Sequence, residues 1–297
     1  MNTAHLSDIP LGVHLDMPAT RYHRLPGASA SILRTLWQST PAHLRVYLDG
    51  EREVTPAMML GTLAHHAILE PDRPLPKLVV PPEVYPCPPD SSLVKSRKAA
   101  PGDPVPWSWA AKFCKQWRQA QEDLGNLVVS HDAYDSTFGT ALAIARHEIA
   151  GPIFVRGRNE VTLVTMDEQL GIPVRCRLDH VPEGPFLVDV KVTHDVTERG
   201  FIRNAYDSGY HLQAALYLDV WNALCGDTDL KEGFKFVTVE SRRPWAVNVF
   251  DATPEFLDRG RRDYLNALAT FARCQRDNHW PAYPPIEIPL CLPAFAR

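Results

Sequence analysis

The stretch Arg177-Leu178-Asp179 is followed, after nine residues, by Asp189-Val190-Lys191. Both triplets lie in apolar, β-branched runs, 172–181 and 186–192, and a Gly184-Pro185 turn separates the runs. This pattern predicts two neighbouring strands. Side chains alternate along a strand, so the aspartate and the lysine of the second triplet face the same way. Because charges inside apolar strands are costly unless they are paired or bind a metal, the spacing predicts a buried cluster of two carboxylates and one amine.

That cluster has the chemistry needed for hydrolysis of a phosphodiester. We expect Asp179, Asp189 and the carbonyl group of Val190 to hold one or two Mg2+ ions, for which Mn2+ could substitute, because hard divalent cations prefer oxygen ligands. Lys191 would offer a positive charge to the attacking water or to the phosphate. The alternative is a solvated face on an edge strand, but the apolar neighbours on both sides indicate burial.

A histidine on a helix is a candidate to complete the metal site. Thr55-Pro56 is a typical helix start, and the helix carries Gly61 and, one turn later on the same side, His65. Glycine costs a helix roughly 1 kcal/mol relative to alanine, and close approach of a backbone or a ligand would justify that cost. A neutral imidazole is a good metal ligand, although a helical histidine is more often a core or surface residue.

Glu160 stands at the start of an expected strand over 161–166. It is equally well interpreted as a further carboxylate near the metals and as an exposed residue at a strand end. The residues around it do not decide between these interpretations.

One face of the helix expected over 210–225 carries Tyr210, Gln213 and Tyr217. A glutamine and two phenols on an otherwise packing face need a polar partner, which a phosphate or the lysine of the cluster would provide. A tyrosine-rich core stripe is the alternative. Both tyrosines are candidate DNA contacts. The candidate phosphate contacts are cationic side chains in two parts of the chain: Arg175 and Arg177 on the first strand, and Lys95, Arg97 and Lys98 in a proline-rich segment.

Composition limits the classes of protein that the chain can belong to. Of the 297 residues, 45% are hydrophobic and 22% charged, which is ordinary for a globular protein. We expect a cytoplasmic protein without membrane contact, because there is no apolar run of about 18–20 residues and no signal-like start. A net charge of −4 argues against a protein that coats DNA nonspecifically, but it does not exclude a nuclease. Six scattered cysteines, without a Cys-x-x-Cys pair, argue against a zinc ribbon and give no support to an iron–sulfur cluster.

The succession of patterns predicts an α/β or α+β fold, with a central mixed sheet flanked by helices and helical additions at its front. We expect residues 1–28 to be irregular and 29–297 to form one domain, with a catalytic sheet core over 152–250. Strands are expected over 153–156, 161–166, 172–181, 186–192, 234–240 and 246–250. The segment 71–106 is expected to be a long proline-rich loop, and the tail over 280–297 to be extended.

Taken in order, these motifs resemble the PD-(D/E)XK nuclease superfamily, and most closely its RecB-like and RecE-like branch. That branch has Gly-x-x-x-His on a helix, then a glutamate, an aspartate ending one strand, Asp-x-Lys on the next and Gln-x-x-x-Tyr on the following helix. Here these are Gly61 to His65, Glu160, Asp179, Asp189 to Lys191, and Gln213 to Tyr217. The nuclease domain of RecE (exonuclease VIII) and its phage relatives are similar over about residues 20–295.

The resemblance implies a magnesium-dependent exonuclease that degrades one strand of duplex DNA from a 5′ end. The product would be a 3′ single-stranded tail for a single-strand annealing partner, and the protein would form a homo-oligomeric ring. It also implies that Gln213 holds Lys191 or the scissile phosphate. Three alternatives remain open: a single-strand-specific RecB-type nuclease, a restriction-type endonuclease and a catalytically silent protein that binds DNA ends.

Overall fold

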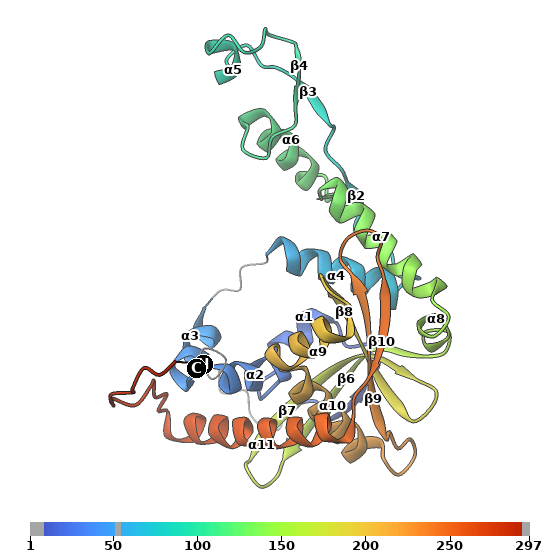
Figure 1. Cartoon of the computed structure of the whole chain (residues 1–297), viewed down its shortest axis with the longest axis vertical. Coiled ribbons are helices and arrows are strands. Elements are labelled where there is room, and N and C mark those ends of the chain that lie inside the picture. The colour runs from blue at the N-terminus through green and yellow to red at the C-terminus, as the bar shows by residue number, and fades with distance from the viewer. Residues whose placement is uncertain (1–8, 51–54, 293–297) are drawn as a thin grey trace.

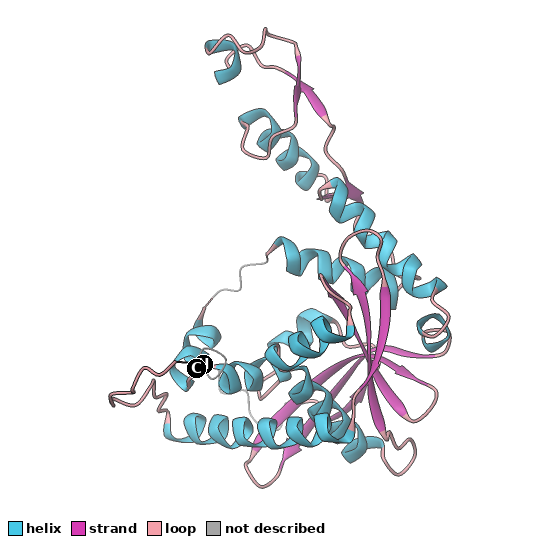
Figure 2. Cartoon of the chain, viewed as in Figure 1, coloured by secondary structure: helices cyan, strands magenta, loops and turns pink. Residues whose placement is uncertain are grey.

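The computed structural model describes residues 9–50 and 55–292, and it shows a six-stranded mixed sheet with helices on both faces (Figures 1 and 2). This confirms the expected fold class. The strand order is β1-β6-β7-β8-β9-β10; β8 and β9 are parallel, and the other pairs are antiparallel. The strands are β1 Gly12–His14, β6 Gly157–Asp167, β7 Ile172–Pro182, β8 Phe186–Thr193, β9 Gly233–Glu240 and β10 Val247–Asp251. Residues 1–8 of the segment expected to be irregular and residues 293–297 of the expected tail lie outside the described ranges, as do 51–54.

The helices form two layers against the sheet. Their bounds are α1 Ala19–Arg24, α2 Ala30–Gln38, α3 Pro41–Asp49, α4 Pro56–Leu69, α7 His131–Arg146, α8 Ala150–Ile153, α9 Glu198–Asp207, α10 Tyr210–Cys225 and α11 Pro254–Asp277. The larger core lies between the sheet and the layer that contains α2, α10 and α11. The smaller core joins Leu69 of α4 and Ile144 of α7 to the opposite face of β8 and β9. None of the helices in the described ranges is long and apolar enough to cross a membrane.

Alternation along β8 separates the two cores and places the polar residues. Leu187 packs in the larger core, whereas Val188 and Val190 pack in the smaller one. Asp189 and Lys191 have the same parity as Leu187, so they face the layer of α10. The strand therefore turns its charged residues toward the helix that carries Gln213.

Two glycines fix where α10 lies. Gly209 precedes the helix with a φ of 68°, and a Cβ there would come within 3.0 Å of the Arg34 side chain. A Cβ on Gly260 of α11 would lie 1.9 Å from the carbonyl oxygen of His211. Only glycine combines the left-handed backbone of the first position with such close packing, and only glycine allows the helix contact at the second.

Three expectations for irregular or extended segments require correction. Residues 9–28 contain β1 and α1, so the described part of this segment is not irregular. Residues 153–156 do not form a strand, because α8 ends at Ile153 and β6 begins at Gly157. Residues 71–106 are not one long loop: they hold three short strands and one helical turn, since closely spaced prolines shorten strands without preventing them.

Residues 77–129 form an arm that projects from the sheet body at α4 and α7 (Figure 1). Its elements are β2 Leu78–Val79, β3 Val84–Pro86, α5 Ser92–Lys95, β4 Pro104–Pro106, α6 Lys112–Asp123 and β5 Leu127–Val128. The parallel pair β2–β5 forms its base, and the antiparallel pair β3–β4 stiffens its far part. The arm has its own small core of Tyr85, Cys87, Val105 and Cys114.

Candidate active site

Three carboxylates lie side by side across three adjacent strands. Glu160 of β6 stands opposite Asp179 of β7, because the residue pairs on either side of them are in register. His180 of β7 pairs with Val188 of β8, so one step further along this antiparallel pair Asp179 meets Asp189. The sheet register therefore assembles the acidic cluster, and it adds Glu160 to the two aspartates.

The backbone around this row departs from regular sheet geometry. Glu160 has a φ of 54°, which is uncommon for a residue with a side chain. The amide of Val190 donates to Oδ2 of Asp179 at 2.8 Å, so a side chain takes the place of a backbone acceptor between β7 and β8. Such departures concentrate at functional sites, where the surrounding structure holds them.

His65 of α4 completes a set of donors suited to a divalent cation. Its Nδ1 atom is 3.6 Å from Oδ2 of Asp179, and its ring lies beside the backbone of Val190. Ligand atoms of His65, Glu160 and Asp179 all lie within 4.8 Å of one another. The nearby Oδ2 of Asp189 is buried and already faces the ammonium group of Lys191. These donors fit a divalent cation, because carboxylate oxygens and neutral imidazole are its usual protein ligands.

The helix α4 presents His65 as the sequence predicts, but Gly61 has a different role from the expected one. Thr55 caps the helix by accepting a hydrogen bond from the amide of Met58, and Pro56 is its first residue. Apart from its chain neighbours and the backbone of its own helix, no described atom lies within 4 Å of where a Cβ of Gly61 would be. Gly61 therefore lines the open cavity over the carboxylates. The expected close approach of another backbone segment is not what requires a glycine here.

Lys191 is held in a closed network with Asp189 and Gln213. Its Nζ atom lies 2.5 Å from Oδ2 of Asp189 and donates to Oε1 of Gln213 at 3.3 Å. The side-chain nitrogen Nε2 of Gln213 donates to Oδ1 of Asp189 at 2.5 Å. Asp189 is almost fully buried, so its charge depends on this network for compensation. In this arrangement Asp189 orients the lysine and borders the candidate metal-ligand cluster, to which Asp179 belongs.

The two tyrosines of α10 differ in their surroundings. Nζ of Lys191 lies 4.5 Å from the ring centroid of Tyr210, which is a cation–π contact. Tyr217 is buried, and burial raises the pKa of its phenol well above the usual value. Tyr210 therefore supports the lysine, whereas Tyr217 lines the cavity over the carboxylates.

The electrostatics of the cluster follow from crowded acids in a half-buried place. Burial, together with the charge of Asp189, raises the pKa of Asp179 well above its usual range, although Lys191 opposes this. Burial also raises the pKa of Glu160, and Arg177 opposes it. Burial lowers the pKa of His65, which favours the neutral, ligating form. For Lys191 burial acts to lower the pKa, but Asp189, Tyr210 and Asp179 together raise it, so the side chain is an ammonium ion.

The two arginines of β7 hold structure around the site. Nε of Arg177 donates to Glu160 at 2.5 Å, and its Nη1 donates to the carbonyl of Met17 and to Thr162. Arg175 is buried, donates to the carbonyl of Tyr22 and lies over the Tyr22 ring. The expectation of a phosphate contact from Arg175 is corrected, because a buried guanidinium does not reach a strand at the surface.

The proline-rich cations are far from this cluster along the fold. Lys95, Arg97 and Lys98 are exposed and belong to the arm, at the end of α5 and in the loop after it. The structure therefore separates them from the carboxylates, and their contact with DNA stays a prediction.

A cavity of about 630 Å3 opens over the carboxylates and contains residues that the motifs did not indicate. Ser29, Ser31 and Arg34 of the α2 region and Thr62 of α4 line it, beside His65 and Gln213. In the sequence, the one sign of Arg34 is that it is a single cation within the apolar pattern of its helix. Its place at the cavity depends on the packing of α2 beside α10.

A mixed sheet that carries a carboxylate on one strand and Asp-x-Lys on the next, with helices on both faces, defines the PD-(D/E)XK nuclease fold. Residues 29–287 match the family described as a PDDEXK-like domain of unknown function (DUF3799), and the chain belongs to this family. The resemblance to the superfamily is thus confirmed, whereas the RecE-like branch stays a prediction.

A solved structure shares the fold over nearly the whole chain. It is described as a "putative exonuclease" from Eubacterium rectale and superimposes with a TM-score of 0.57, covering 92% of this chain and 97% of the other. The two sequences are 14% identical, so this likeness shows the fold alone. No curated protein sequence matches the chain.

Proposed function

We propose that this protein is a metal-dependent exodeoxyribonuclease that hydrolyses duplex DNA from an end. The observation that supports this most is the row of Glu160, Asp179 and Asp189, flanked by His65 on one side and Lys191 on the other. The membership in a PDDEXK-like family agrees with it. A 5′ start, a 3′ single-stranded product, an annealing partner and a ring-shaped oligomer belong to the proposal only through the RecE-like resemblance.

The residues have separable tasks in this reaction. His65, Glu160 and Asp179, with Asp189 and the Val190 carbonyl beside them, would hold Mg2+. When bound, the metal polarises the phosphate and makes water a better nucleophile. Lys191, as an ammonium ion, stabilises negative charge on the phosphate oxygens during attack. Because its pKa is raised, Lys191 is better suited to this role than to removing a proton from water.

The positioning groups keep Lys191 in place while the phosphate changes. Gln213 bridges Lys191 and Asp189, and the ring of Tyr210 faces the ammonium group. Arg177 fixes one oxygen of Glu160 and leaves the other available to a cation. Preorganised charges of this kind reduce the reorganisation that the reaction requires.

The test is digestion of duplexes labelled separately at the 5′ and 3′ ends, with Mg2+ and with EDTA. With Mg2+ we expect the 5′ label to be released before the 3′ label. We expect no cleavage of closed circular DNA. Cleavage of the circle would instead support the restriction-type alternative, and digestion of single strands alone would support the RecB-type one. Binding without any turnover would support the catalytically silent alternative and contradict the proposal.

A further inference from the structure

The arm carries most of the lysines of the chain, and these form no ion pair with the residues that the structure describes. Five of the eight lysines lie there: Lys77, Lys95, Lys98, Lys112 and Lys115. None of these five forms an ion pair with any residue that the structure describes. By contrast, Lys191, Lys231 and Lys235 of the body each pair with an aspartate. Several exposed cations without an ion pair, carried on one projecting element, favour an external polyanion as the partner.

Charge also divides between the two regions. Residues 77–129 contain seven Lys and Arg against five Asp and Glu, although the whole chain has 31 against 35. The arm is therefore net positive on a net negative protein. Arg118 is the arm cation that does pair, with Glu122 on the same helix.

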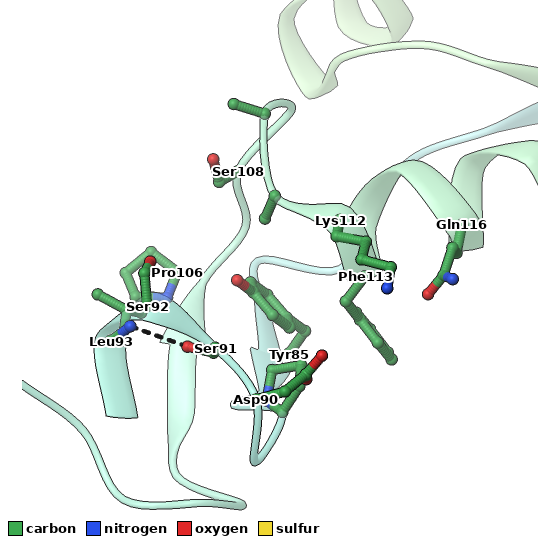
Figure 3. Close-up of a pocket in the computed structure, with 13 residues that line it drawn as sticks. Tyr85, Asp90, Ser91, Ser92, Leu93, Pro106, Ser108, Lys112, Phe113 and Gln116 are labelled. Atoms are coloured by element: carbon green, nitrogen blue, oxygen red, sulfur yellow. Dashed lines mark hydrogen bonds between the residues drawn. The ribbon is translucent and has the colours of Figure 1, made fainter. Parts of the chain in front are cut away.

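Between α5 and the first turns of α6 the arm has a groove of about 590 Å3 (Figure 3). Tyr85 and Phe113 lie within it, and their rings are stacked at 5.2 Å between centroids with an interplanar angle of 9°. Lys112 and Gln116 line the α6 side, and Ser91 and Ser92 line the α5 side. Asp90 is the one acidic residue among those that line the groove.

These features match an unpaired nucleotide better than a base pair. Nonspecific single-strand sites combine aromatic rings, on which bases stack, with cations that follow the backbone. Here the partly buried ring of Phe113 lines the groove against the buried Tyr85, hydroxyl, amide and carboxylate groups can meet a base edge, and Lys112 stands at the groove wall. Trp109, which follows Ser108 of the groove wall, is 45% exposed and packs edge-on against Trp107.

We propose that the groove between α5 and α6 binds an unpaired DNA strand, with its phosphates on Lys112 and Lys115 and on the cations after α5. The identity of the polymer as DNA rests on the proposed nuclease function. The arm leaves the body at the end of α4, the helix that carries His65, so a strand that leaves the cavity over the carboxylates can follow the arm.

The test is fluorescence anisotropy of labelled (dT)20 with the full chain in EDTA, where no cleavage interferes. The variant Lys112→Gln/Lys115→Gln removes two exposed charges, so its fold is retained. We expect its affinity to fall roughly tenfold at moderate salt, and the slope of log K against log salt to flatten by about 1.4. The matched control is Lys235→Gln, which removes a paired lysine on the body and is expected to bind like the unchanged chain.

A second measurement locates the strand directly. An oligonucleotide that contains 5-bromodeoxyuridine is irradiated on the unchanged chain, and crosslinked peptides are identified by mass spectrometry. Crosslinks within residues 85–117 support the proposal. Crosslinks on the body alone overturn it, and so does a charge variant that binds (dT)20 like the control. A loss of affinity for a blunt duplex without a loss for (dT)20 also overturns it.

The outcomes for the arm and for the active site are separable. If DNA is never digested but (dT)20 binding still depends on Lys112 and Lys115, the nuclease function fails and the inference holds. If digestion is normal and the arm variant binds like the control, the inference fails and the nuclease function holds.

Discussion

The arm and the sheet body contain opposite surpluses of charge. In the body, Glu160, Asp179 and Asp189 stand together, and Lys191 and Arg177 are the cations in direct contact with them. In the arm, exposed lysines stand without aspartates or glutamates paired to them in the described part of the chain. This difference underlies the two proposals, of a bound cation at the surplus acids and of a bound polyanion at the surplus lysines. Each region can be tested by removing one charge and using a paired charge elsewhere as the control.

The largest expected effect is on turnover. Lys191→Ala should lower the rate of DNA digestion about 10²–10³-fold, because a preorganised charge next to the phosphate is removed. Lys235→Ala, which breaks an exposed pair with Asp251, should digest DNA like the unchanged chain. Initial rates on end-labelled duplex in Mg2+ measure both. Equal rates for the two variants would show that Lys191 has no special role.

The comparison predicts that a lysine of the body contributes more to the stability of the fold than a lysine of the arm. Nζ of the buried Lys231 donates to the carbonyls of Pro182 and Gly184 and pairs with Asp229. Lys231→Ala should lower the free energy of unfolding by about 2–3 kcal/mol, because buried acceptors lose their donor. Lys115→Ala, in the arm, should change it by less than about 0.5 kcal/mol. Urea denaturation gives both values, and similar losses would contradict the distinction.

Metal affinity tests the acidic surplus. Asp179→Asn should weaken Mn2+ binding at least about tenfold, or about 1.4 kcal/mol, since a charged ligand becomes a neutral one. Asp72→Asn, an exposed residue outside the cavity, is the control. Calorimetric titration measures the affinities. An unchanged affinity for Asp179→Asn would place the metal elsewhere.

Removing the ring of Tyr210, which faces the ammonium group of Lys191, should have a smaller effect on catalysis. Tyr210→Leu removes the cation–π contact, which is worth about 0.5–2 kcal/mol, so kcat should fall about twofold to thirtyfold. Tyr210→Phe keeps the ring and should restore most of kcat, with KM little changed in both variants. If Tyr210→Phe is as slow as Tyr210→Leu, the hydroxyl matters and the ring does not.

The smallest effect is on the pH dependence of stability in EDTA. The pKa of Asp179 is higher in the folded chain than in the unfolded chain, so holding it ionised at neutral pH destabilises the fold. Asp179→Asn should therefore have the higher Tm at pH 7, and the difference should shrink as the pH falls through the folded-state pKa. Adding Mg2+ should reverse the order, because it stabilises the chain that binds it more tightly by the larger amount. A difference in EDTA that is independent of pH would show that Asp179 is not the titrating group.

The sequence predicted the sheet body more accurately than the arm. The helix over 210–225 has the expected bounds, and Asp179, Asp189 and Lys191 meet as expected, because strand alternation and a short turn leave little freedom. The arm up to residue 106 was expected to be a loop, since its strands have two or three residues and the arm core is small, formed by Tyr85, Cys87, Val105 and Cys114. Such short elements lack a periodic pattern to detect.

The roles of single charged residues were harder to predict than their positions. Arg175 and Arg177 look alike in the sequence, but one is buried against Tyr22 and the other holds Glu160. From the sequence, Glu160 could equally be a metal ligand or an exposed residue at a strand end. The register of the sheet places it opposite Asp179. Burial and register are properties of the packed sheet, and neighbours in sequence do not reveal them.

The amino-acid sequence by itself determined the identity of the acidic pair and the lysine, because alternation along a strand fixes which side chains share a face. It also determined the fold class, through the order of helices and strands. Only the tertiary structure decided that Asp189 holds Lys191 while Asp179 joins His65 and Glu160. It also decided that five lysines stand on an arm without an ion pair to any described residue. The physical reason is that pairing between charges depends on distances of a few ångströms between segments far apart in the chain, and folding alone sets these distances.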